Sequence, residues 1–121
     1  MKGWIDYEDD LIQLSKVELI KIRPENVEFI FKGKCNKYKI LYCTFDAISN
    51  QLEGFILITR ILKEKEGYIK DIDVPLGIPI DTICNIYSYR NERVIQFDND
   101  MRFVVKETYD ELKQKIKEAS E

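Results

Sequence analysis

Histidine is absent from this chain of 121 residues. The chain therefore lacks the side chain that most often serves as a general base and as a ligand for transition metals. Its three cysteines, Cys35, Cys43 and Cys84, are odd in number and form no Cys-x-x-Cys pair. That pattern predicts neither a zinc site nor a disulfide framework, and it is typical of a reducing, cytoplasmic compartment. We therefore expect no metal, no other cofactor and no catalytic site.

Long apolar runs and an excess of positive charge are also missing. The longest strongly apolar run, Phe55 to Ile58, is too short to span a bilayer. The first ten residues, MKGWIDYEDD, turn acidic and lack the apolar stretch of a secretory signal. The net charge of −3 argues against broad binding of nucleic acid, which needs clustered cations. Contact with a membrane surface is left open by these features.

Hydrophobic residues make up 45% of the chain, enough for a buried core, so we expect one domain over residues 1–121. Most of the apolar residues follow the alternation of β-strands and are rich in β-branched and aromatic types. Tyr38–Phe45 is apolar on both faces and is expected to be a central strand. The other candidate strands are Val17–Arg23, Val27–Phe31, Phe55–Leu62, Tyr68–Val74, Ile83–Tyr89, Arg93–Phe97 and Met101–Lys106.

Two segments need a choice between helix and strand. Phe55–Leu62 could continue a helix that begins at Asp46, but Gly54 would interrupt that helix at a cost of about 1 kcal/mol. We therefore expect a strand there, paired with Tyr68–Val74 through a Lys-Glu-Lys-Glu-Gly turn at residues 63–67.

The last segment is clearly helical, because Thr108 and Glu111 form a capping-box pattern. One apolar stripe follows along that helix, made of Tyr109, Leu112, Ile116 and Ala119. The sequence thus predicts an α+β fold of mainly antiparallel strands, closed by a C-terminal helix.

An internal sequence similarity suggests an old duplication. Thr44-Phe45-Asp46 recurs as Thr108-Tyr109-Asp110, and the matching flanks predict a duplicated β-β-β-α unit over residues 10–53 and 76–119. The alternative is that two β-to-α junctions look alike because capping and packing demand the same residues. Ala47 stands where the second copy has its capping acid.

A second pattern competes with the duplication. A strand with a Gly-hydrophobic-Thr-Arg motif precedes a strand with an Ile-Pro motif and a closing helix. The residues that carry this pattern are Gly54, Thr59, Arg60, Ile78, Pro79, Ile80 and Ile83. Over residues 27–118 the chain resembles bacterial pleckstrin-homology-like and GRAM-type domains, which implies a barrel closed by a helix. The part from Pro79 to Ile116 also resembles a small flagellar-operon protein family, which implies no particular chemistry. The first 23 residues lie outside the resemblance and are expected to add one or two strands to the sheet.

The densest positive patch is a predicted hairpin loop with four lysines: Lys32, Lys34, Lys37 and Lys39. Their ammonium groups could converge on a phosphate or another anion. Pleckstrin-homology domains that bind phosphoinositides carry basic residues in a similar hairpin, but this loop lacks the arginine that would grip a phosphate with two nitrogens. The alternative is a solvated loop whose lysines protect a sheet edge.

Aromatic residues mark a candidate protein interface, made of Trp4, Tyr87, Tyr89 and Arg90. A partly buried sheet face would explain them as well. Cys43 and Cys84 are expected to be small core residues.

Acidic pairs offer weaker candidates. Asp71 and Asp73 share one face of a predicted strand and could do acid–base chemistry in a pocket, although a solvent-facing strand explains them better. Asp98 to Asp100 fits a hairpin turn better than a calcium loop, because the glycine and glutamate of such a loop are missing.

These features predict a non-enzymatic binding or protein-interaction module. Its partner is expected to be another protein or, through an exposed strand edge, a second copy of the chain. The alternatives are binding of an anion or lipid headgroup through the Lys32–Lys39 loop, and a small inhibitor protein from a phage or mobile element. The abundance of Ile, Lys and Glu suggests a bacterial or phage source.

Overall fold

The computed structural model describes residues 1–33, 37–66 and 68–121, and within these it describes the side chains outside positions 63–71. The strands are β1 (Trp4–Tyr7), β2 (Asp10–Gln13), β3 (Val17–Ile22), β4 (Val27–Phe31), β5 (Tyr38–Leu41), β6 (Phe55–Glu66), β7 (Tyr68–Pro79), β8 (Ile83–Tyr89), β9 (Glu92–Phe97) and β10 (Arg102–Val105). The helical elements are the short 3-10 turns η1 (Leu14–Lys16), η2 (Phe45–Ala47), η3 (Ser49–Gln51) and η4 (Ile80–Thr82), and the α-helix α1 (Tyr109–Ala119).

The strands form a two-stranded sheet, β1–β2, and an eight-stranded sheet in the order β5-β4-β3-β7-β6-β10-β9-β8. Every strand pairing is antiparallel. The predicted α+β class, mainly antiparallel with a C-terminal helix, is therefore confirmed. The large sheet is open, with β5 and β8 as its outer strands, and so it differs from the closed barrel that the resemblance implied. The resemblance to pleckstrin-homology-like domains stays a prediction.

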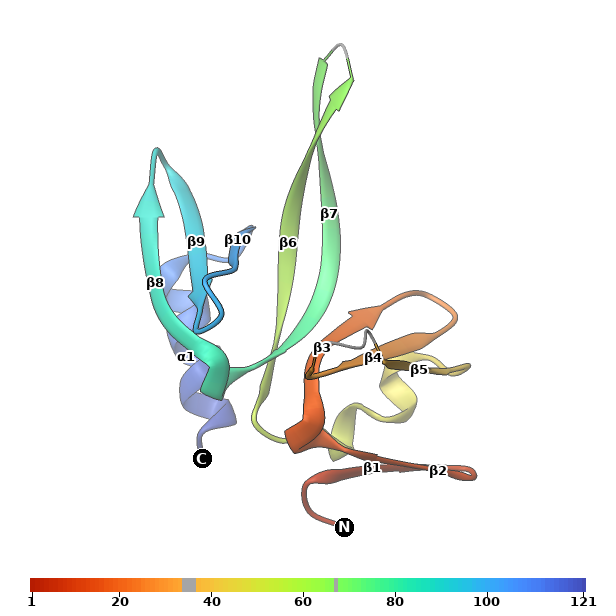
Figure 1. Cartoon of the computed structure of the whole chain (residues 1–121). Helices are drawn as coiled ribbons and strands as arrows, with labels where there is room; N and C mark the ends of the chain where they lie inside the picture. Colours follow the sequence, from red (N-terminus) through yellow and green to blue (C-terminus); the bar gives the residue numbers. More distant parts are fainter. Residues whose placement is uncertain (34–36, 67) are drawn as a thin grey trace.

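A long central hairpin, β6–β7, joins two halves of the molecule (Figure 1). The strand predicted at Phe55–Leu62 is confirmed, and its pairing runs from Phe55↔Pro79 to Glu66↔Tyr68. The turn predicted at residues 63–67 is too long, because β6 continues to Glu66. The N-terminal half, β1 to β5 with η1 to η3, joins β7 through β3. The C-terminal half, β8 to β10 with α1, joins β6 through β10. In the sheet, each half thus joins the other through the central hairpin.

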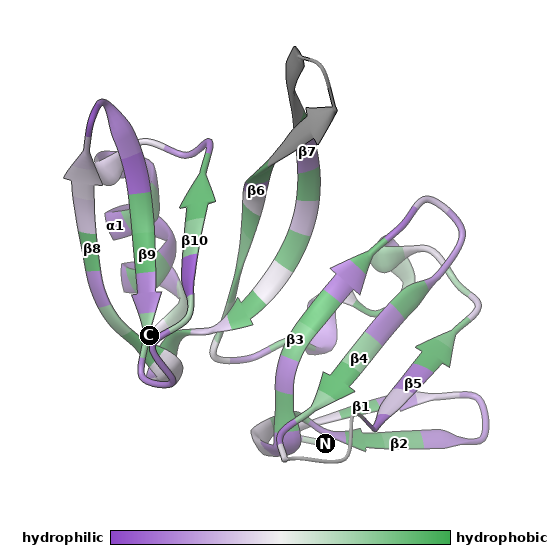
Figure 2. Cartoon of the chain, turned by 45° about the horizontal axis from the view of Figure 1, so that its top comes forward, coloured by the Kyte–Doolittle hydropathy of each residue, from purple (hydrophilic) through white to green (hydrophobic). Residues whose placement is uncertain are grey.

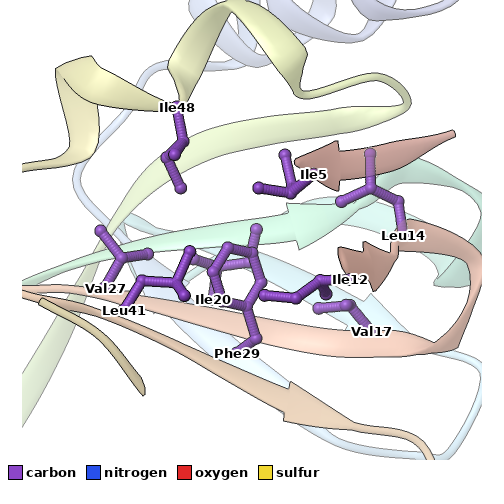
Figure 3. Packing of buried hydrophobic residues seen from close by; sticks show 9 residues of the cluster. All are labelled: Ile5, Ile12, Leu14, Val17, Ile20, Val27, Phe29, Leu41 and Ile48. Atoms are coloured by element: carbon purple, nitrogen blue, oxygen red, sulfur yellow. The ribbon is translucent and has the colours of Figure 1, made fainter. Parts of the chain in front are cut away.

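The two halves have separate hydrophobic cores. The first core lies in the N-terminal half and is made of Ile5, Ile12, Leu14, Val17, Ile20, Val27, Phe29, Leu41 and Ile48 (Figure 3). The second core lies between the central hairpin, β9, β10 and α1, and is made of Ile56, Ile58, Leu76, Ile78, Ile95, Phe97, Phe103, Val105 and Leu112. Because side chains alternate along a strand, β3 contributes to both: Ile20 belongs to the first core, and its neighbour Leu19 packs against the second.

The position of β5 corrects one prediction. Tyr38–Phe45 was expected to form a central strand, but β5 ends at Leu41 and lies at the outer edge of the sheet. Only Leu41 of this strand is buried, while Tyr38 and Lys39 are exposed. Tyrosine is amphipathic and tolerates solvent, so an apolar count on both faces overstated the burial of this strand.

The C-terminal helix begins as predicted. The hydroxyl of Thr108 accepts a hydrogen bond from the backbone N–H of Glu111 at 3.2 Å, and the Glu111 carboxylate accepts one from the backbone N–H of Thr108. Leu112 is fully buried, and Ile116 and Ala119 pack against the second core. Tyr109 is the exception, because it is 49% exposed and lies outside the core. The Arg93 guanidinium lies 5.9 Å from its ring centre.

The remaining local predictions concern turns and repeats. Asp98 to Asp100 forms the expected hairpin turn between β9 and β10, with Asp100 at φ 68°. Residues 1–23 add β3 to the large sheet, while β1 and β2 form their own sheet. Within each segment of the proposed repeat, a 3-10 turn, η1 or η4, is followed by three strands and then by helical structure. The strand after η1, β3, is internal in the large sheet, whereas the strand after η4, β8, lies at its edge. The duplication stays a prediction.

Candidate functional site

A cleft opens between the two halves of the molecule, on the side of the sheet that carries the second core. It has a volume of about 310 Å³. Its walls come from β3 and β4 on one side and from η4 and the β9–β10 hairpin on the other. The residues that line it are Glu18, Leu19, Ile30, Lys32, Ile78, Thr82, Phe97, Asp98, Asn99, Met101 and Phe103.

The register of β3 and β4 explains the apolar near wall. Leu19 pairs with Ile30, one position before Ile20, which pairs with Phe29 in the first core. Successive side chains of a strand point to opposite faces, so Leu19 and Ile30 turn away from the first core and toward the cleft. Both are partly buried, which leaves apolar surface available to a ligand.

The far wall of the cleft is aromatic. The rings of Phe97 and Phe103 meet edge to face, with centroids 4.8 Å apart. The guanidinium of Arg60 lies 4.0 Å from the centre of the Phe103 ring, and burial lowers the pKa of Arg60. Ile78, from the central hairpin, is buried beneath them. Ile78, Phe97 and Phe103 belong to the second core, so its packing holds this wall of the cleft in place.

Polar groups gather at the rim. The Asn99 side-chain amide donates a hydrogen bond to the Glu18 carboxylate at 3.3 Å, which links the two halves across the cleft. The Asn99 side-chain oxygen accepts the backbone N–H of Met101 at 3.0 Å, and the backbone N–H of Asp98 donates to the Thr82 carbonyl at 2.9 Å. These hydrogen bonds hold the β9–β10 turn in place at the rim of the cleft.

The chemistry of the cleft is that of an apolar pocket with a charged rim. Glu18 and Asp98 bring carboxylates to the rim and Lys32 brings an ammonium group, while Met101, 47% exposed, projects an apolar side chain. Over the described residues, the structure contains no cluster of three or more His, Cys, Asp or Glu side chains that could hold a metal ion. Such a cleft can bury an apolar group and orient the polar atoms around it.

The lysine loop is only partly described. Lys32 lines the cleft, and Lys37 is exposed beside β5. Lys39 forms an ion pair with Asp10 at 3.1 Å, which draws it toward the β1–β2 hairpin. Lys34 lies outside the described residues. Anion binding by the loop stays a prediction.

The residues of the predicted interface occupy two separate places. Tyr87, Tyr89 and Arg90 lie on the β8–β9 hairpin, where Tyr89 is 58% exposed and the Arg90 guanidinium is 5.2 Å from its ring centre. Trp4 lies in β1, in the other half of the molecule, and is partly buried. Tyr87, Tyr89 and Arg90 can therefore share one contact surface without Trp4.

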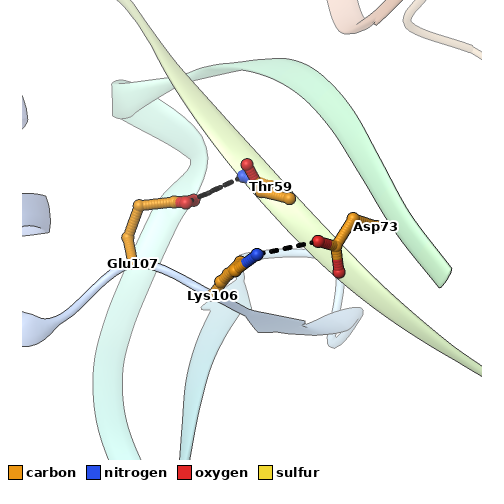
Figure 4. A network of polar contacts seen from close by, with 4 residues as sticks. All are labelled: Thr59, Asp73, Lys106 and Glu107. Carbon is orange, nitrogen blue, oxygen red and sulfur yellow. Dashed lines mark hydrogen bonds and ion pairs between the residues drawn. The ribbon is translucent and has the colours of Figure 1, made fainter. Parts of the chain in front are cut away.

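The predicted acidic pair lies on β7. Asp73 is exposed and forms an ion pair with Lys106 at 3.0 Å (Figure 4), an interaction that raises the pKa of Lys106. The side chain of Asp71 lies outside the described part of the chain. Next to this ion pair, the Glu107 carboxylate accepts a hydrogen bond from the backbone N–H of Thr59 at 3.0 Å. The described contacts of Asp73 thus help to fasten the C-terminal half to the central hairpin.

Sequence reasoning missed the cleft itself. One signal was present in β3, where Leu19 and Ile20 are both apolar although they point to opposite faces. Strand β4 repeats that signal with Phe29 and Ile30. Hydrophobic residues along β3, β4, β9 and β10 are visible in Figure 2. These pairs of adjacent apolar residues indicate that β3 and β4 have apolar side chains on both faces. Which segment packs against the second face depends on the order of strands in the sheet, which the sequence does not show.

Within the part of the chain that the structure describes, none of the helices has the length and apolar character needed to cross a membrane. A scan against protein-family models found no match for this chain, and searches of curated proteins and of solved structures found none either.

Proposed function

We propose that this chain is a non-enzymatic binding module that takes an apolar side chain of a partner protein into the cleft between its halves. The observation that carries this proposal is the apolar wall of Leu19 and Ile30, which faces the rings of Phe97 and Phe103 across about 310 Å³. An apolar group that enters the cleft would lose its contact with water against surfaces already held in place. Burial of such a group is favourable by about 25 cal/mol for each Å² removed from water.

The size and rim of the cleft favour a protein side chain over a large cofactor. Its volume is near the lower end of about 300–1,000 Å³ for small-molecule sites, which suits one or two bulky apolar side chains. The rim carries both signs of charge, from Glu18, Asp98 and Lys32. Side chains and backbone groups that flank an anchor residue could pair with them.

Anion binding by the lysine loop is the less supported alternative. Lys39 already has a carboxylate partner in Asp10, and Lys32 lies at the rim beside two acidic residues. Nearby carboxylates compete with an anion for these ammonium groups.

Selection of displayed peptides against the whole chain tests the proposal. The selected peptides are expected to share an apolar anchor residue. Their affinity for the Met101→Glu variant should fall by about tenfold or more, because a charge would then stand at the mouth of the apolar cleft.

Tyr42→Glu is the matched control, because Tyr42 is 79% exposed and is not among the residues that line the cleft. The control should bind the peptides as the parent chain does. Equal binding by Met101→Glu, or selection of peptides without an apolar anchor, would contradict the proposal.

A further inference from the structure

Strand β8 forms an unprotected outer edge of the large sheet. Among the described residues it pairs on one side only, with β9. Its seven residues, ICNIYSY, include neither a charged residue nor a proline. The opposite edge strand, β5, has only four residues and carries Lys39. Short length and lysine are common protections of sheet edges, so β5 is protected and β8 is open to pairing.

The turn after β8 identifies the free backbone groups. Arg90 and Asn91 form a two-residue hairpin turn with φ values of 50° and 65°, the geometry of a type I′ turn. In such a hairpin the flanking residues, Tyr89 and Glu92, exchange hydrogen bonds, and so does every second pair along the ladder. The backbone N–H and C=O groups of Ser88 and Ile86 therefore point away from β9. They are the groups that another strand would bind.

A groove for side chains runs beside this edge. It is lined on one side by Ile83, Cys84, Asn85 and Ile86 of β8, and on the other by Tyr109, Lys113 and Ile116 of α1. Its volume is about 310 Å³. A strand added to β8 would place alternate side chains over this groove, and apolar ones would cover the exposed ring of Tyr109.

The charges at the two ends of β8 indicate in which direction a second copy of β8 would pair with it. Asp81, exposed, lies in η4 two residues before β8 begins, and Arg90, also exposed, directly follows β8. In a parallel pairing of two copies, Arg90 would face Arg90 and Asp81 would face Asp81, and like charges repel. In an antiparallel pairing, Arg90 of each copy would approach Asp81 of the other, and the residues of β8 between them carry no charge.

We propose that β8 pairs antiparallel with β8 of a second copy of this chain, which gives a two-fold symmetric dimer with one continuous sheet. Pairing uses the outward backbone groups of Ile86 and Ser88, and the groove beside α1 receives apolar side chains of the other copy. The same patch serves both copies, so the assembly closes at two. The groove beside α1 and the cleft between the halves share no lining residue, so the two sites are distinct.

Sedimentation of the purified full chain tests the dimer. A small interface of this kind is expected to dissociate at about 10–100 μM. At about 500 μM the parent chain should then approach twice the monomer mass of 14.4 kDa. The Ser88→Pro variant should stay at the monomer mass at the same concentration, because proline removes the outward N–H of an exposed position.

Ser88→Ala is the matched control. It loses the hydroxyl, which accepts a hydrogen bond from Arg93, but keeps the backbone N–H, and it should form dimers as the parent does. If Ser88→Pro fails to fold, Asn85→Lys gives the same test. Asn85 is exposed and lies near the midpoint between Asp81 and Arg90, where two antiparallel copies would bring the added like charges together. A parent chain that is monomeric at about 500 μM, an assembly larger than a dimer, or a folded edge variant that still forms dimers would overturn the proposal.

Discussion

At the scale of single residues, the two described cysteines have different surroundings that the sequence did not distinguish. Cys43 is partly buried against the first core, near Tyr7 and Glu8, and burial followed by the charge of Glu8 raises the pKa of its thiol. Cys84 was expected in the core but is exposed on β8. It sits at an irregularity in the β8–β9 register, where the alternation of side chains between the two faces of the strand is interrupted. The core prediction considered only that cysteine is a small, usually buried residue.

This difference predicts the order of chemical modification. The thiolate is the reactive form, so a raised pKa and partial burial both slow the reaction of Cys43. With iodoacetamide at about pH 8, Cys84 should react at least about ten times faster than Cys43. A time course of peptide mass spectrometry measures both rates in one sample, and equal rates would contradict the placement of Cys43.

The same thiol gives a direction for the pH dependence of stability. Folding raises its pKa above the usual 9.0, so the folded chain holds this proton more tightly than the unfolded chain does. The stabilisation is therefore fully present below pH 9.0 and is lost as the pH rises through the folded pKa. Denaturant titrations from pH 8 to 11 should show a smaller alkaline loss of stability for Cys43→Ala than for the parent chain.

Gly77 makes a second residue-scale prediction, because it brings β7 close to β3. A Cβ at this position would lie 3.2 Å from the Cβ of Ile20, a buried member of the first core. Gly77→Ala should cost about 1 kcal/mol of unfolding free energy and Gly77→Val about 2–3 kcal/mol, since the core would be overpacked. Urea denaturation checks both, and a Gly77→Val variant as stable as the parent would rule out this close approach.

At the scale of elements, the two similar β-to-helix junctions behave differently. Thr108 caps α1 with its hydroxyl, whereas Thr44, the matching residue of the proposed repeat, makes no side-chain capping bond to η2. Thr108→Ala should therefore lower the unfolding free energy by about 1 kcal/mol, and Thr44→Ala should have a much smaller effect. Equal losses in the two variants, measured by urea denaturation, would show that the capping box is not the source of the difference.

Elements whose signals are local were predictable from the sequence. The capping box of α1, the turn at Asp98 to Asp100 and the strand at Phe55–Leu62 depend on neighbouring residues, and the structure contains all three. The edge position of β5 depends instead on which strands become its neighbours. The order of strands in the sheet cannot be read from a local sequence pattern. The number of apolar residues in Tyr38–Phe45 therefore led to the wrong prediction of a central strand.

At the scale of the whole molecule, the cleft follows from two cores on one open sheet. Leu19 and Ile30 face away from the first core, and the second core lies mainly in the C-terminal half. Part of their apolar surface therefore remains open beside the β9–β10 hairpin. The sequence could show that both faces of β3 and β4 are apolar, but not that Phe97 and Phe103 would face them, because those pairs are distant in the chain.

Nuclear magnetic resonance with methyl-labelled protein tests the central claim, the binding of an apolar side chain in the cleft. N-acetyl-leucine amide, a mimic of one such side chain, is titrated against the full chain. We predict saturable shifts at the methyl groups of Leu19, Ile30 and Met101, with a dissociation constant of about 1–10 mM. The methyl groups of Val27 and Ile48, in the first core, should stay unchanged. Absence of saturable shifts at the cleft, or equal shifts in the first core, would contradict the account.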